Sequence, residues 1–544
     1  MLISSLLISI LPSLIHAAAS QETQQVCDYL FSKYPQNLAY DTLGLSAIKS
    51  ALNAIPYTKA TWEYWNNENW QYRPACAFFP ATAQHVAEAV QILNRHPSVQ
   101  FALKGGGHNP AAGFAAVKDG LLIAFETNLA TTERTPDGAH FIVGAGNRWQ
   151  DVYRVTEKTN QVVVGGRLGH VGVAGFALGG GLSYYSAQYG LTCDNVDNFE
   201  AVLANGTIVN ANRQEHPNLW WALRGGGNQF AIVTRMWMQA HPAGINGQVW
   251  GGLRTFAPEQ RYEVFRAITR FVRDYPDPKA AIIPIILFGM PGNMLNALTG
   301  PFVFLFYDGP SPPPGALDDF LAIPSMIDTT KTRSYYDLTQ EMGAGDFIGF
   351  SQAFRVATFP NMEERSMMEF FDDSWNTTYS KTFASGMQTL DLQLITWEPQ
   401  PLSRRIQAAS LAQGGNTYGF DPSHGDKIWL AHTRMWMNPI SQPQQSAKEL
   451  LDGFLATHQQ RHGGVVATGS QYTGDAFAPL VMNDGAQSNY APMFMNDAAA
   501  DQSYDVYNSY GAANLARLQS IKWSYDPYGF FTNRQGGHKI PGTV

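Results

Sequence analysis

One histidine of this chain, His108, lies at the end of a glycine run, Lys104-Gly-Gly-Gly-His108. Glycines let a backbone turn with positive φ and approach a ligand closely. A neutral imidazole nitrogen in such a loop is a nucleophile that could attack an electrophilic carbon of a cofactor. The residue types by themselves fit this role and the role of a structural, hydrogen-bonded histidine equally.

Two more glycine clusters follow along the chain, Gly172-Val-Ala-Gly175 with Gly179-Gly-Gly181, and Gly225-Gly-Gly227-Asn228. Successive backbone N–H groups in such loops can converge on one anion, which suits a pyrophosphate. Any one cluster is equally a tight turn, but each follows a strand-like run. We therefore expect the three clusters to belong to one site for a phosphate-bearing cofactor.

Several other kinds of site are not supported by the spacing of residues. No cluster has the G-x-G-x-x-G spacing at a strand-to-helix junction or the G-x-x-x-x-G-K-[ST] spacing, so neither a nicotinamide site nor a P-loop is predicted. H-E-x-x-H and G-x-S-x-G are absent as well. His458 and His462 have the spacing of two metal ligands on a helix, but no acidic or cysteine ligand lies beside them, so we favour a solvated helix end and expect no metal.

Length and composition indicate a large globular protein. The chain has 544 residues, 45% of them hydrophobic and 15% charged, which predicts two packed lobes rather than a disordered or fibrous chain. The formal net charge of -8, without any stripe of Lys and Arg, disfavours nucleic acid as a partner.

The glycine clusters must be positioned by an α/β region from about residue 75 to 238. Here we expect a helix at 80–94, strands at 101–103, 121–125, 141–143, 162–164 and 231–236, and a hairpin that turns at Asn205-Gly206 between 201–203 and 208–209. A second lobe is expected between about 247 and 490, with a helix at 260–273 and a strand at 301–307, before a C-terminal helix at 514–522.

The glycine motifs occur in an order and spacing that resemble a known family. The chain resembles the FAD-binding half of the vanillyl-alcohol oxidase and p-cresol methylhydroxylase superfamily, nearest its berberine-bridge-enzyme-like branch. The matching stretches are 104–108, 144–149, 164–167, 171–175, 178–181, 189–190, 194–196 and 224–228, together with the ending Tyr525-Asp-Pro-Tyr-Gly-Phe-Phe531.

The resemblance implies an α+β, two-lobed FAD-binding PCMH-type fold. Its substrate domain would be separate and built on an antiparallel sheet flanked by helices. The expected divisions are a signal peptide at 1–19, an FAD-binding domain at 20–240, a substrate-binding domain at 241–500, and a segment at 501–544 that returns to the FAD domain.

The resemblance also implies which residues hold the cofactor. His108 would bind the ring methyl group of FAD covalently, and Leu168 stands where many relatives carry a second, cysteine tether. The residues expected at the cofactor are Lys104, Gly105, Gly106, Gly107, His108, Asn109, Gly113, Gly172, Val173, Gly175, Gly179, Gly180, Gly181, Tyr189, Gly190, Asp194, Asn195, Gly227, Asn228, Ile232 and Val233.

For such a protein the implied reaction is an oxidation. A hydride would pass from a small organic substrate to FAD while a base removes a proton, and molecular oxygen would reoxidise the flavin to give hydrogen peroxide. Asp497 stands where several relatives have a tyrosine base, and this departure favours a secondary-metabolite intermediate as substrate over a sugar. A solvated turn role for Asp497 stays open, as do three tyrosines as the base: Tyr504, Tyr507 and Tyr510, although Tyr510 suits packing at the lobe interface better.

Two other functions are compatible with the sequence. An oligosaccharide oxidase would use the aromatic content of 12% to stack sugars. A secreted flavin- or glycan-binding protein could keep the same fold without turnover.

The N-terminus predicts secretion, into the extracellular space or the lumen of the secretory pathway. An apolar run from Leu2 to Ile15 precedes small residues at 17–19, and it is too short for stable membrane insertion. In an oxidising compartment Cys27 and Cys76 could pair, leaving Cys193 as a buried, inert thiol. Two sequons, at Asn205 and Asn376, could carry glycans.

Overall fold

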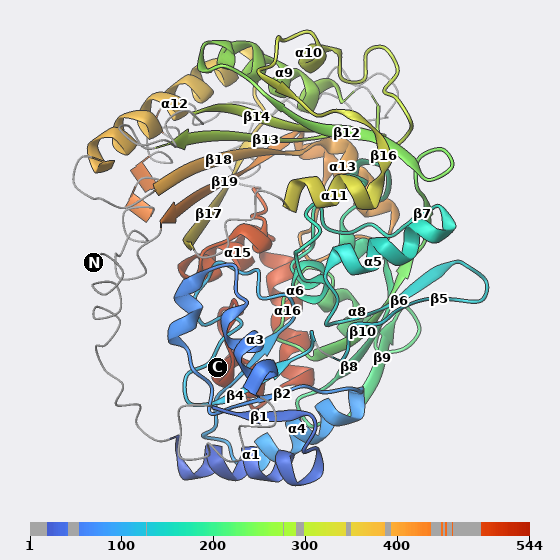
Figure 1. Cartoon of the computed structure of the whole chain (residues 1–544), viewed down its shortest axis with the longest axis vertical. Coiled ribbons are helices and arrows are strands. Elements are labelled where there is room, and N and C mark those ends of the chain that lie inside the picture. The colour runs from blue at the N-terminus through green and yellow to red at the C-terminus, as the bar shows by residue number, and fades with distance from the viewer. Residues whose placement is uncertain are drawn as a thin grey trace, which may run out of the picture.

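The computed structural model describes residues 19–41, 54–126, 128–275, 277–289, 299–343, 350–386, 393–436, 448–449, 452–453, 460 and 491–543. These residues form two lobes, with a large sheet in the upper lobe and smaller sheets of four, five and two strands in the lower one (Figure 1). The fold is mixed α+β, as expected. The apolar run at the N-terminus, His458 and His462 lie outside the described residues.

The first sheet of the lower lobe carries the strand that leads into the His108 loop. Its order is β1 (Leu38–Tyr40), β2 (Cys76–Phe78), β4 (Leu121–Ala124) and β3 (Phe101–Lys104), with β2, β4 and β3 parallel. Helix α1 (Gln21–Lys33) and helix α4 (Ala83–Arg95) lie beside this sheet (Figure 1). The apolar face of α4 is fully buried at Val86, Val90 and Leu93, which confirms the predicted helix there.

The second sheet of the lower lobe is antiparallel, in the order β5 (Thr132–Arg134), β6 (His140–Gly144), β10 (Ile232–Gln239), β8 (Val196–Val202) and β9 (Ile208–Asn212). The predicted hairpin joins β8 to β9, where Gly206 has a φ of +83°. The predicted strand at 162–164 is only the short β7 (Gln161–Val162), paired with β11 (His241–Pro242). Helices of this lobe are α3 (Ala54–Trp62), α5 (Trp149–Thr156), α6 (Val173–Leu178), α7 (Ser186–Tyr189) and α8 (Pro217–Leu223).

The upper lobe is built on an antiparallel sheet. Its order is β15 (Ile327–Asp328), β12 (Gln248–Thr255), β14 (Gly300–Tyr307), β13 (Ala280–Gly289), β18 (Gln393–Leu402), β19 (Lys427–Trp436) and β17 (Ser351–Pro360), and β16 (Lys331–Ser334) also pairs with β12. The lobe also contains α10 (Asp318–Leu321), α11 (Tyr335–Gly343) and α13 (Arg404–Ala412).

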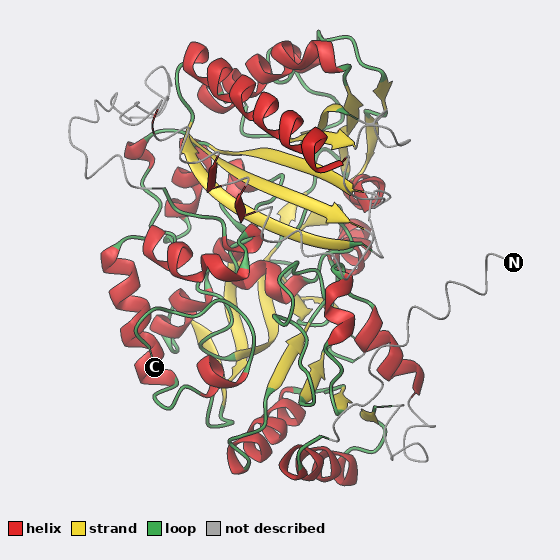
Figure 2. Cartoon of the chain, turned by 90° about the vertical axis from the view of Figure 1, so that its left-hand side faces the viewer, coloured by secondary structure: helices red, strands yellow, loops and turns green. Residues whose placement is uncertain are grey.

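Two long helices cover the outer face of this sheet, α9 (Arg261–Asp274) and α12 (Glu364–Gly386) (Figure 2). The ring of Phe265 in α9 and that of Phe371 in α12 each lie 5.7 Å from the ring of Trp397 in β18. Because these rings pack against the outer face of the sheet, the inner face of the sheet is directed towards the lower lobe. Residues on that face alternate along the strands with residues that contact the helices.

The C-terminal segment lies against the lower lobe (Figure 1). It contains α15 (Ser503–Ser509), α16 (Ala512–Tyr525) and α17 (Phe530–Arg534). The buried Lys522 ammonium donates to the carbonyl oxygen of Gln229 at 2.7 Å and pairs with Asp526, while the Arg534 guanidinium donates to the carbonyl oxygen of Val99 at 2.8 Å. These contacts fix the chain end that supplies Asp497.

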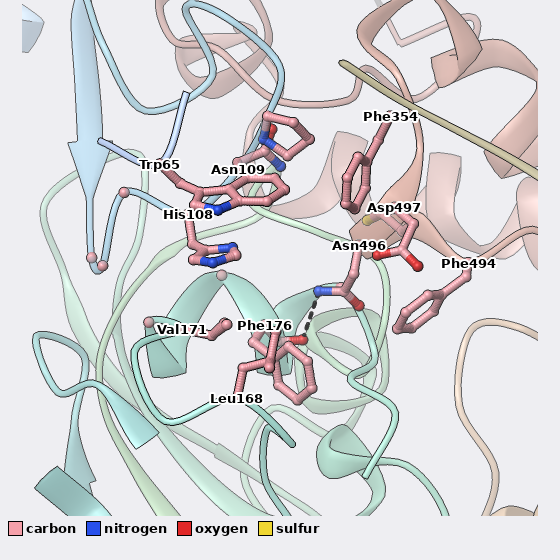
Figure 3. A pocket seen from close by; sticks show the side chains of 18 of the residues that line it. Trp65, His108, Asn109, Leu168, Val171, Phe176, Phe354, Phe494, Asn496 and Asp497 are labelled. Carbon is pink, nitrogen blue, oxygen red and sulfur yellow. Dashed lines mark hydrogen bonds between the residues drawn. The ribbon is translucent and has the colours of Figure 1, made fainter. Parts of the chain in front are cut away.

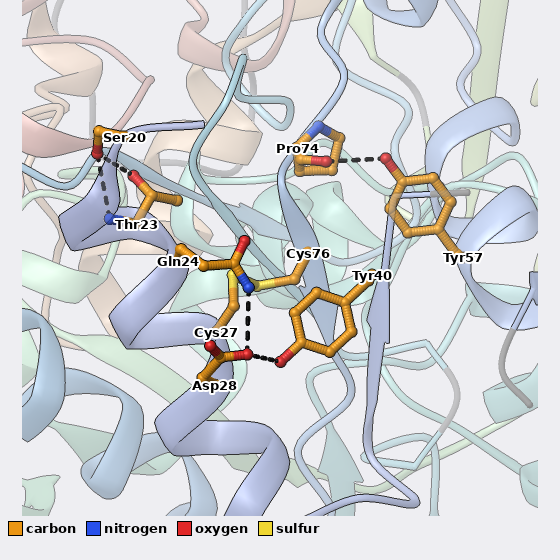
Figure 4. The surroundings of a disulfide bond; sticks show 9 residues. All are labelled: Ser20, Thr23, Gln24, Cys27, Asp28, Tyr40, Tyr57, Pro74 and Cys76. Carbon is orange, nitrogen blue, oxygen red and sulfur yellow. Dashed lines mark hydrogen bonds between the residues drawn. A yellow bond between two sulfur atoms is a disulfide. The ribbon is translucent and has the colours of Figure 1, made fainter. Parts of the chain in front are cut away.

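A disulfide joins Cys27 in α1 to Cys76 in β2, with 6.1 Å between the Cα atoms (Figure 4). It ties the start of the described chain to the first sheet. Cys193 is a buried free thiol, as expected. Asn205 and Asn376 are both exposed. Within the described part of the chain, no helix combines the length and apolar character needed to cross a membrane.

Candidate active site

A cavity of about 750 Å³ lies between the two lobes. Its lower wall consists of the glycine loops, its upper wall of the inner face of the large sheet, and a third side of residues 494–497 and 537–538 from the C-terminal segment. A volume of this size is typical of a site for a cofactor or small ligand. His108 and Asp497 both line the cavity, from different segments of the chain (Figure 3).

The His108 ring contacts two other rings, one at its face and one at its edge. The indole of Trp65 stacks on it with 4.4 Å between centroids and an angle of 11° between planes (Figure 3). At the edge of the His108 ring, Nε2 of His170 lies 2.7 Å from Nε2 of His108. The imidazole therefore has a fixed orientation at the cavity wall.

Both imidazoles are neutral at pH 7. Burial, the neighbouring His170 and the Arg148 guanidinium hold the pKa of His108 well below its usual value. Burial, and then Arg148, lowers the pKa of His170 to about 4. In the hydrogen bond between them, one ring nitrogen must carry a proton and the other must accept it. The bond thus couples the tautomer of His108 to that of His170.

The strand that precedes the His108 loop is anchored by a buried ion pair. The Lys104 ammonium donates to Oε1 of Glu126 at 2.9 Å, and the Lys104 side chain has no exposed surface. Burial lowers the pKa of Lys104, and the charge of Glu126 opposes that shift. The guanidinium of Arg148 lies 3.7 Å from the other carboxylate oxygen of Glu126.

Two glycine loops meet so closely that neither could carry a side chain at the contact. A Cβ built on Gly106 would lie 2.6 Å from the Cα of Gly172, and one built on Gly172 would lie 2.3 Å from the N of Gly106. A Cβ at Gly175 would meet no atom within 4 Å. The wall of the cavity is thus bare backbone beside a nucleophilic histidine, and this arrangement fits the flavin and pyrophosphate of FAD.

About half of the residues expected at the cofactor line this cavity. They are Gly105, Gly106, Gly107, His108, Asn109, Gly172, Gly175, Gly179, Gly227, Asn228, Ile232 and Val233. The others lie behind the lining: Lys104, Gly113, Val173, Gly180, Gly181, Tyr189, Gly190, Asp194 and Asn195. As FAD contacts, all of them stay predictions.

Several residues behind the lining have clear structural contacts. Asp194 forms a fully buried ion pair with Arg224 at 3.0 Å, and the ring of Tyr189 stacks on His241 at 3.8 Å. Gly181 donates its backbone N–H to Oδ1 of Asn496 at 3.1 Å. These contacts hold the segments next to the glycine loops in place.

Asp497 lies in a short 3₁₀ turn, Met495–Asp497. Asn496 fixes this turn, because its side chain donates to the carbonyl oxygen of Phe176 at 3.1 Å (Figure 3). Gln400 on β18 donates to Oδ2 of Asp497 at 2.8 Å and accepts a hydrogen bond from Arg167. Burial raises the pKa of Asp497 to about 6, although Arg167 and Gln400 oppose that shift.

A second carboxyl group, that of Glu398, lines the same cavity. It accepts hydrogen bonds from the hydroxyls of Thr396 and Thr433. Burial, reinforced by the charge of Asp497, raises the pKa of Glu398 to about 8 against the effect of these hydroxyls. At pH 7 the cavity therefore presents one ionised carboxylate, on Asp497, and one protonated carboxyl group, on Glu398. Two carboxyls with separated pKa values are the usual basis for a division into base and acid.

The three tyrosines considered as bases do not line the cavity. Tyr504 is 65% exposed. The hydroxyls of Tyr507 and Tyr510 donate to the carbonyl oxygens of Gly226 and Gly225, at 3.0 and 3.2 Å. Tyr510 is buried, with its ring 4.6 Å from that of Tyr418, so the expectation that it serves packing is confirmed.

Sequence reasoning missed several residues of the cavity: Trp65, Arg167, His170, Glu398 and Gln400. Arg167 ends the motif at 164–167 and His170 directly precedes the motif at 171–175, so their position in the chain was a usable signal. Along their strand, Glu398 and Gln400 lie on one face and Trp397 lies on the other. Polar residues at every second position are a weaker signal of a site in the sequence. Nothing near Trp65 indicates its contact with His108.

The comparisons with known proteins agree with this site. A family model described as "FAD binding domain" matches residues 74–212, and one described as "Berberine and berberine like" matches residues 493–536. An uncharacterised FAD-linked oxidoreductase of Arthroderma benhamiae is 31% identical over 90% of this chain and 91% of its own length. An FAD-dependent monooxygenase of Cochliobolus heterostrophus is 30% identical over 88% of this chain and 87% of its own length.

Solved structures show the same fold at lower identity. Glucooligosaccharide oxidase from Acremonium strictum, whose structure is described with a 6-S-cysteinyl, 8α-N1-histidyl FAD, is 18% identical, with a TM-score of 0.68 over 94% of this chain and 99% of its own. Xylooligosaccharide oxidase from Myceliophthora thermophila is 18% identical, with a TM-score of 0.67 over 94% of this chain and 99% of its own.

Proposed function

Because this chain belongs to the berberine-bridge-enzyme-like branch of the FAD-linked oxidoreductases, we propose that it is a secreted oxidase of a small organic molecule. The substrate class is a secondary-metabolite intermediate, oxidised at an alcohol, an amine or an activated C–H bond. The observation that carries this proposal is the presence of a nucleophilic imidazole, on His108, and a pair of carboxyl groups, on Asp497 and Glu398, at one cavity.

In this proposal His108 holds FAD by one covalent bond from a ring nitrogen to the ring methyl group of the flavin. Nε2 of His108 is hydrogen-bonded to His170, so Nδ1 is the nitrogen left for this bond. The histidyl FAD named for the Acremonium strictum enzyme supports it. Leu168 lines the cavity where a cysteine tether would stand, and leucine cannot form a second bond.

Bound FAD would supply the acceptor for the substrate hydride, and molecular oxygen would take two electrons and two protons from the reduced cofactor to give hydrogen peroxide. The protein orients the substrate and handles its proton. Asp497, ionised at pH 7, accepts that proton, and Gln400 and Arg167 hold its carboxylate in place. Glu398, protonated at the same pH, donates a hydrogen bond to the substrate heteroatom.

Secretion is part of the proposal. The disulfide between Cys27 and Cys76 supports an oxidising compartment, and the exposed Asn205 and Asn376 are accessible for glycosylation. A covalent bond to FAD suits that setting, because a cofactor that dissociated outside the cell would be diluted away.

A second candidate is a monooxygenase, because several relatives near 30% identity bear that name. Both reactions need FAD and oxygen, but they differ in where the oxygen atoms end. An oxidase releases one hydrogen peroxide for each substrate oxidised, whereas a monooxygenase places one atom of oxygen in the product and reduces the other to water with two electrons from a reductant such as a nicotinamide.

The test is a screen of candidate substrates for anaerobic bleaching of the flavin, followed by admission of ¹⁸O₂. Bleaching with one equivalent of hydrogen peroxide per substrate and no ¹⁸O in the product supports the oxidase. Incorporation of ¹⁸O supports the monooxygenase. A flavin that neither a substrate nor an added nicotinamide reductant bleaches would instead favour a binding protein without turnover.

A further inference from the structure

The inner face of the large sheet, which lines the cavity, has an apolar part and a narrow polar part. Neighbouring strands β12, β14 and β13 contribute a row of paired side chains, with Leu253 opposite Phe304 and Phe304 opposite Ile283. The next row along β14 and β13 pairs Phe302 with Ile285. All five side chains line the cavity. This part of the wall offers no hydrogen-bonding side chain to a ligand.

On the sheet face, the polar side chains that line the cavity are confined to β18 and β19, beside the turn that carries Asp497. Thr396 on β18 lies opposite Thr433 on β19, and apolar residues flank this pair on both sides: Leu287 on β13 and Phe354 on β17. The polar part of the sheet wall is therefore two strands wide, with apolar strands on either side.

The polar groups of this part already bind one another. Both threonine hydroxyls donate to Glu398, and the Gln400 amide is shared between Arg167 and Asp497. A sugar needs a separate hydrogen-bond partner for each of several hydroxyls, since a buried polar group without a partner costs about 1–3 kcal/mol. The side chains of this wall offer hydrogen-bond partners to one ligand hydroxyl only.

The charges that line the cavity are balanced. The Asp497 carboxylate is linked through Gln400 to the Arg167 guanidinium, and Glu341, which also lines the cavity, pairs with Arg333. A cationic ligand would lose its hydration without meeting an unpaired negative charge, which is unfavourable in a low-dielectric site. The wall thus favours an uncharged ligand.

We propose that the substrate is an uncharged, largely apolar molecule with a ring system that packs on Phe302, Phe304 and Ile285, and with a single alcohol group directed at Asp497 and Glu398. This inference deepens the proposed function and rests on it for the choice of this cavity as the substrate site. It excludes sugars and protonated amines as good ligands.

The test uses the full chain with its FAD, under anaerobic conditions at pH 7, and measures binding by perturbation of the flavin absorption spectrum. The probes are 2-naphthylmethanol, 2-naphthylmethylamine, which has the same skeleton with a protonated amine, and cellobiose. We expect the alcohol to bind at least about 10-fold more tightly than the amine, a difference of about 1.4 kcal/mol, and cellobiose to bind more weakly than both.

A matched pair of variants locates the binding surface. Ile285→Ser places a hydroxyl in the apolar wall and should weaken binding of the alcohol by about 10-fold. Ile327→Ser makes the same change at an exposed position of the same sheet, 55% accessible and outside the cavity lining, and should leave binding unchanged. An unchanged melting temperature of Ile285→Ser would show that the fold is intact.

Tighter binding of cellobiose or of the amine, or no binding of the alcohol, would overturn the inference. If the two serine variants changed binding of the alcohol equally, the apolar sheet wall would not be its binding surface. Failure of the proposed function would look different from failure of this inference. The alcohol would then bind selectively, but no bound alcohol would bleach the flavin.

Discussion

Nε2 of His170 lies 2.7 Å from Nε2 of His108, at the wall of the cavity between the two lobes. Since burial lowers the pKa of both rings, this contact is a hydrogen bond between two neutral imidazoles rather than a charged pair. It can fix the proton on one nitrogen of His108 and leave the lone pair of the other directed at the cofactor.

The first prediction concerns this bond. His170→Ala should lower the fraction of covalently bound flavin, because His108 would lose the partner that fixes its tautomer and orientation. His170→Gln keeps a hydrogen-bonding side chain and should retain more covalent flavin than the alanine variant. The fraction is measured from flavin absorbance in the pellet and supernatant after acid precipitation. Full covalent flavin in His170→Ala would show that His108 needs no such partner.

The second prediction concerns the base. Asp497→Asn should slow reduction of the flavin by substrate by about 100- to 10,000-fold, as expected when a general base is removed. Covalent flavin should be unchanged, because Asp497 and His108 lie on different sides of the cavity. Asp505→Asn, an exposed aspartate in α15, is the matched control. Stopped-flow absorbance measures both, and a normal rate in Asp497→Asn would place the base elsewhere.

The third prediction concerns pH. The reaction needs Asp497 ionised and Glu398 protonated, so the rate of flavin reduction should rise as the pH passes about 6 and fall as it passes about 8. In Glu398→Gln the amide does not titrate, so the fall above pH 8 should disappear while the rise near pH 6 remains. A fall that persists in Glu398→Gln would assign it to another group.

The fourth prediction concerns stability. The bond between Cys27 and Cys76 closes a loop of 49 residues. In the chain-entropy description its loss should lower the free energy of unfolding by about 4 kcal/mol. Cys27→Ala combined with Cys76→Ala should therefore lower the melting temperature, whereas Cys193→Ala should leave the disulfide and its contribution intact. Equal melting temperatures of the double variant and the wild type would contradict this contribution.

Local sequence patterns predicted a large part of the lower lobe. The helix α4 and the strands β3, β4 and β6 follow from a 3.6-residue period or from short β-branched runs, and the loop of His108 follows from its glycines. The strand at 162–164 was predicted too long. The chain there turns early into Gly165 and Gly166, where any Cβ would contact the Trp149 indole, and no local pattern shows that contact.

The polar part of the cavity could not be predicted in the same way. Gln400 and Asp497 are 97 residues apart in the chain, and Gln400 and Arg167 are 233 apart, yet they form one hydrogen-bonded set. Their meeting depends on the register of β18 in the sheet and on the return of the C-terminal segment. Asp497 was found only through its place in a family pattern, and Glu398 had no such pattern to mark it.

The most direct measurement of the central claim is the visible absorption spectrum of the purified protein before and after acid precipitation, with His108→Ala beside it. We expect a yellow protein whose colour stays in the pellet, and a His108→Ala variant whose colour passes into the supernatant. Colour lost to the supernatant by the wild type would contradict the bond to His108, and a colourless native protein would contradict the flavoprotein itself.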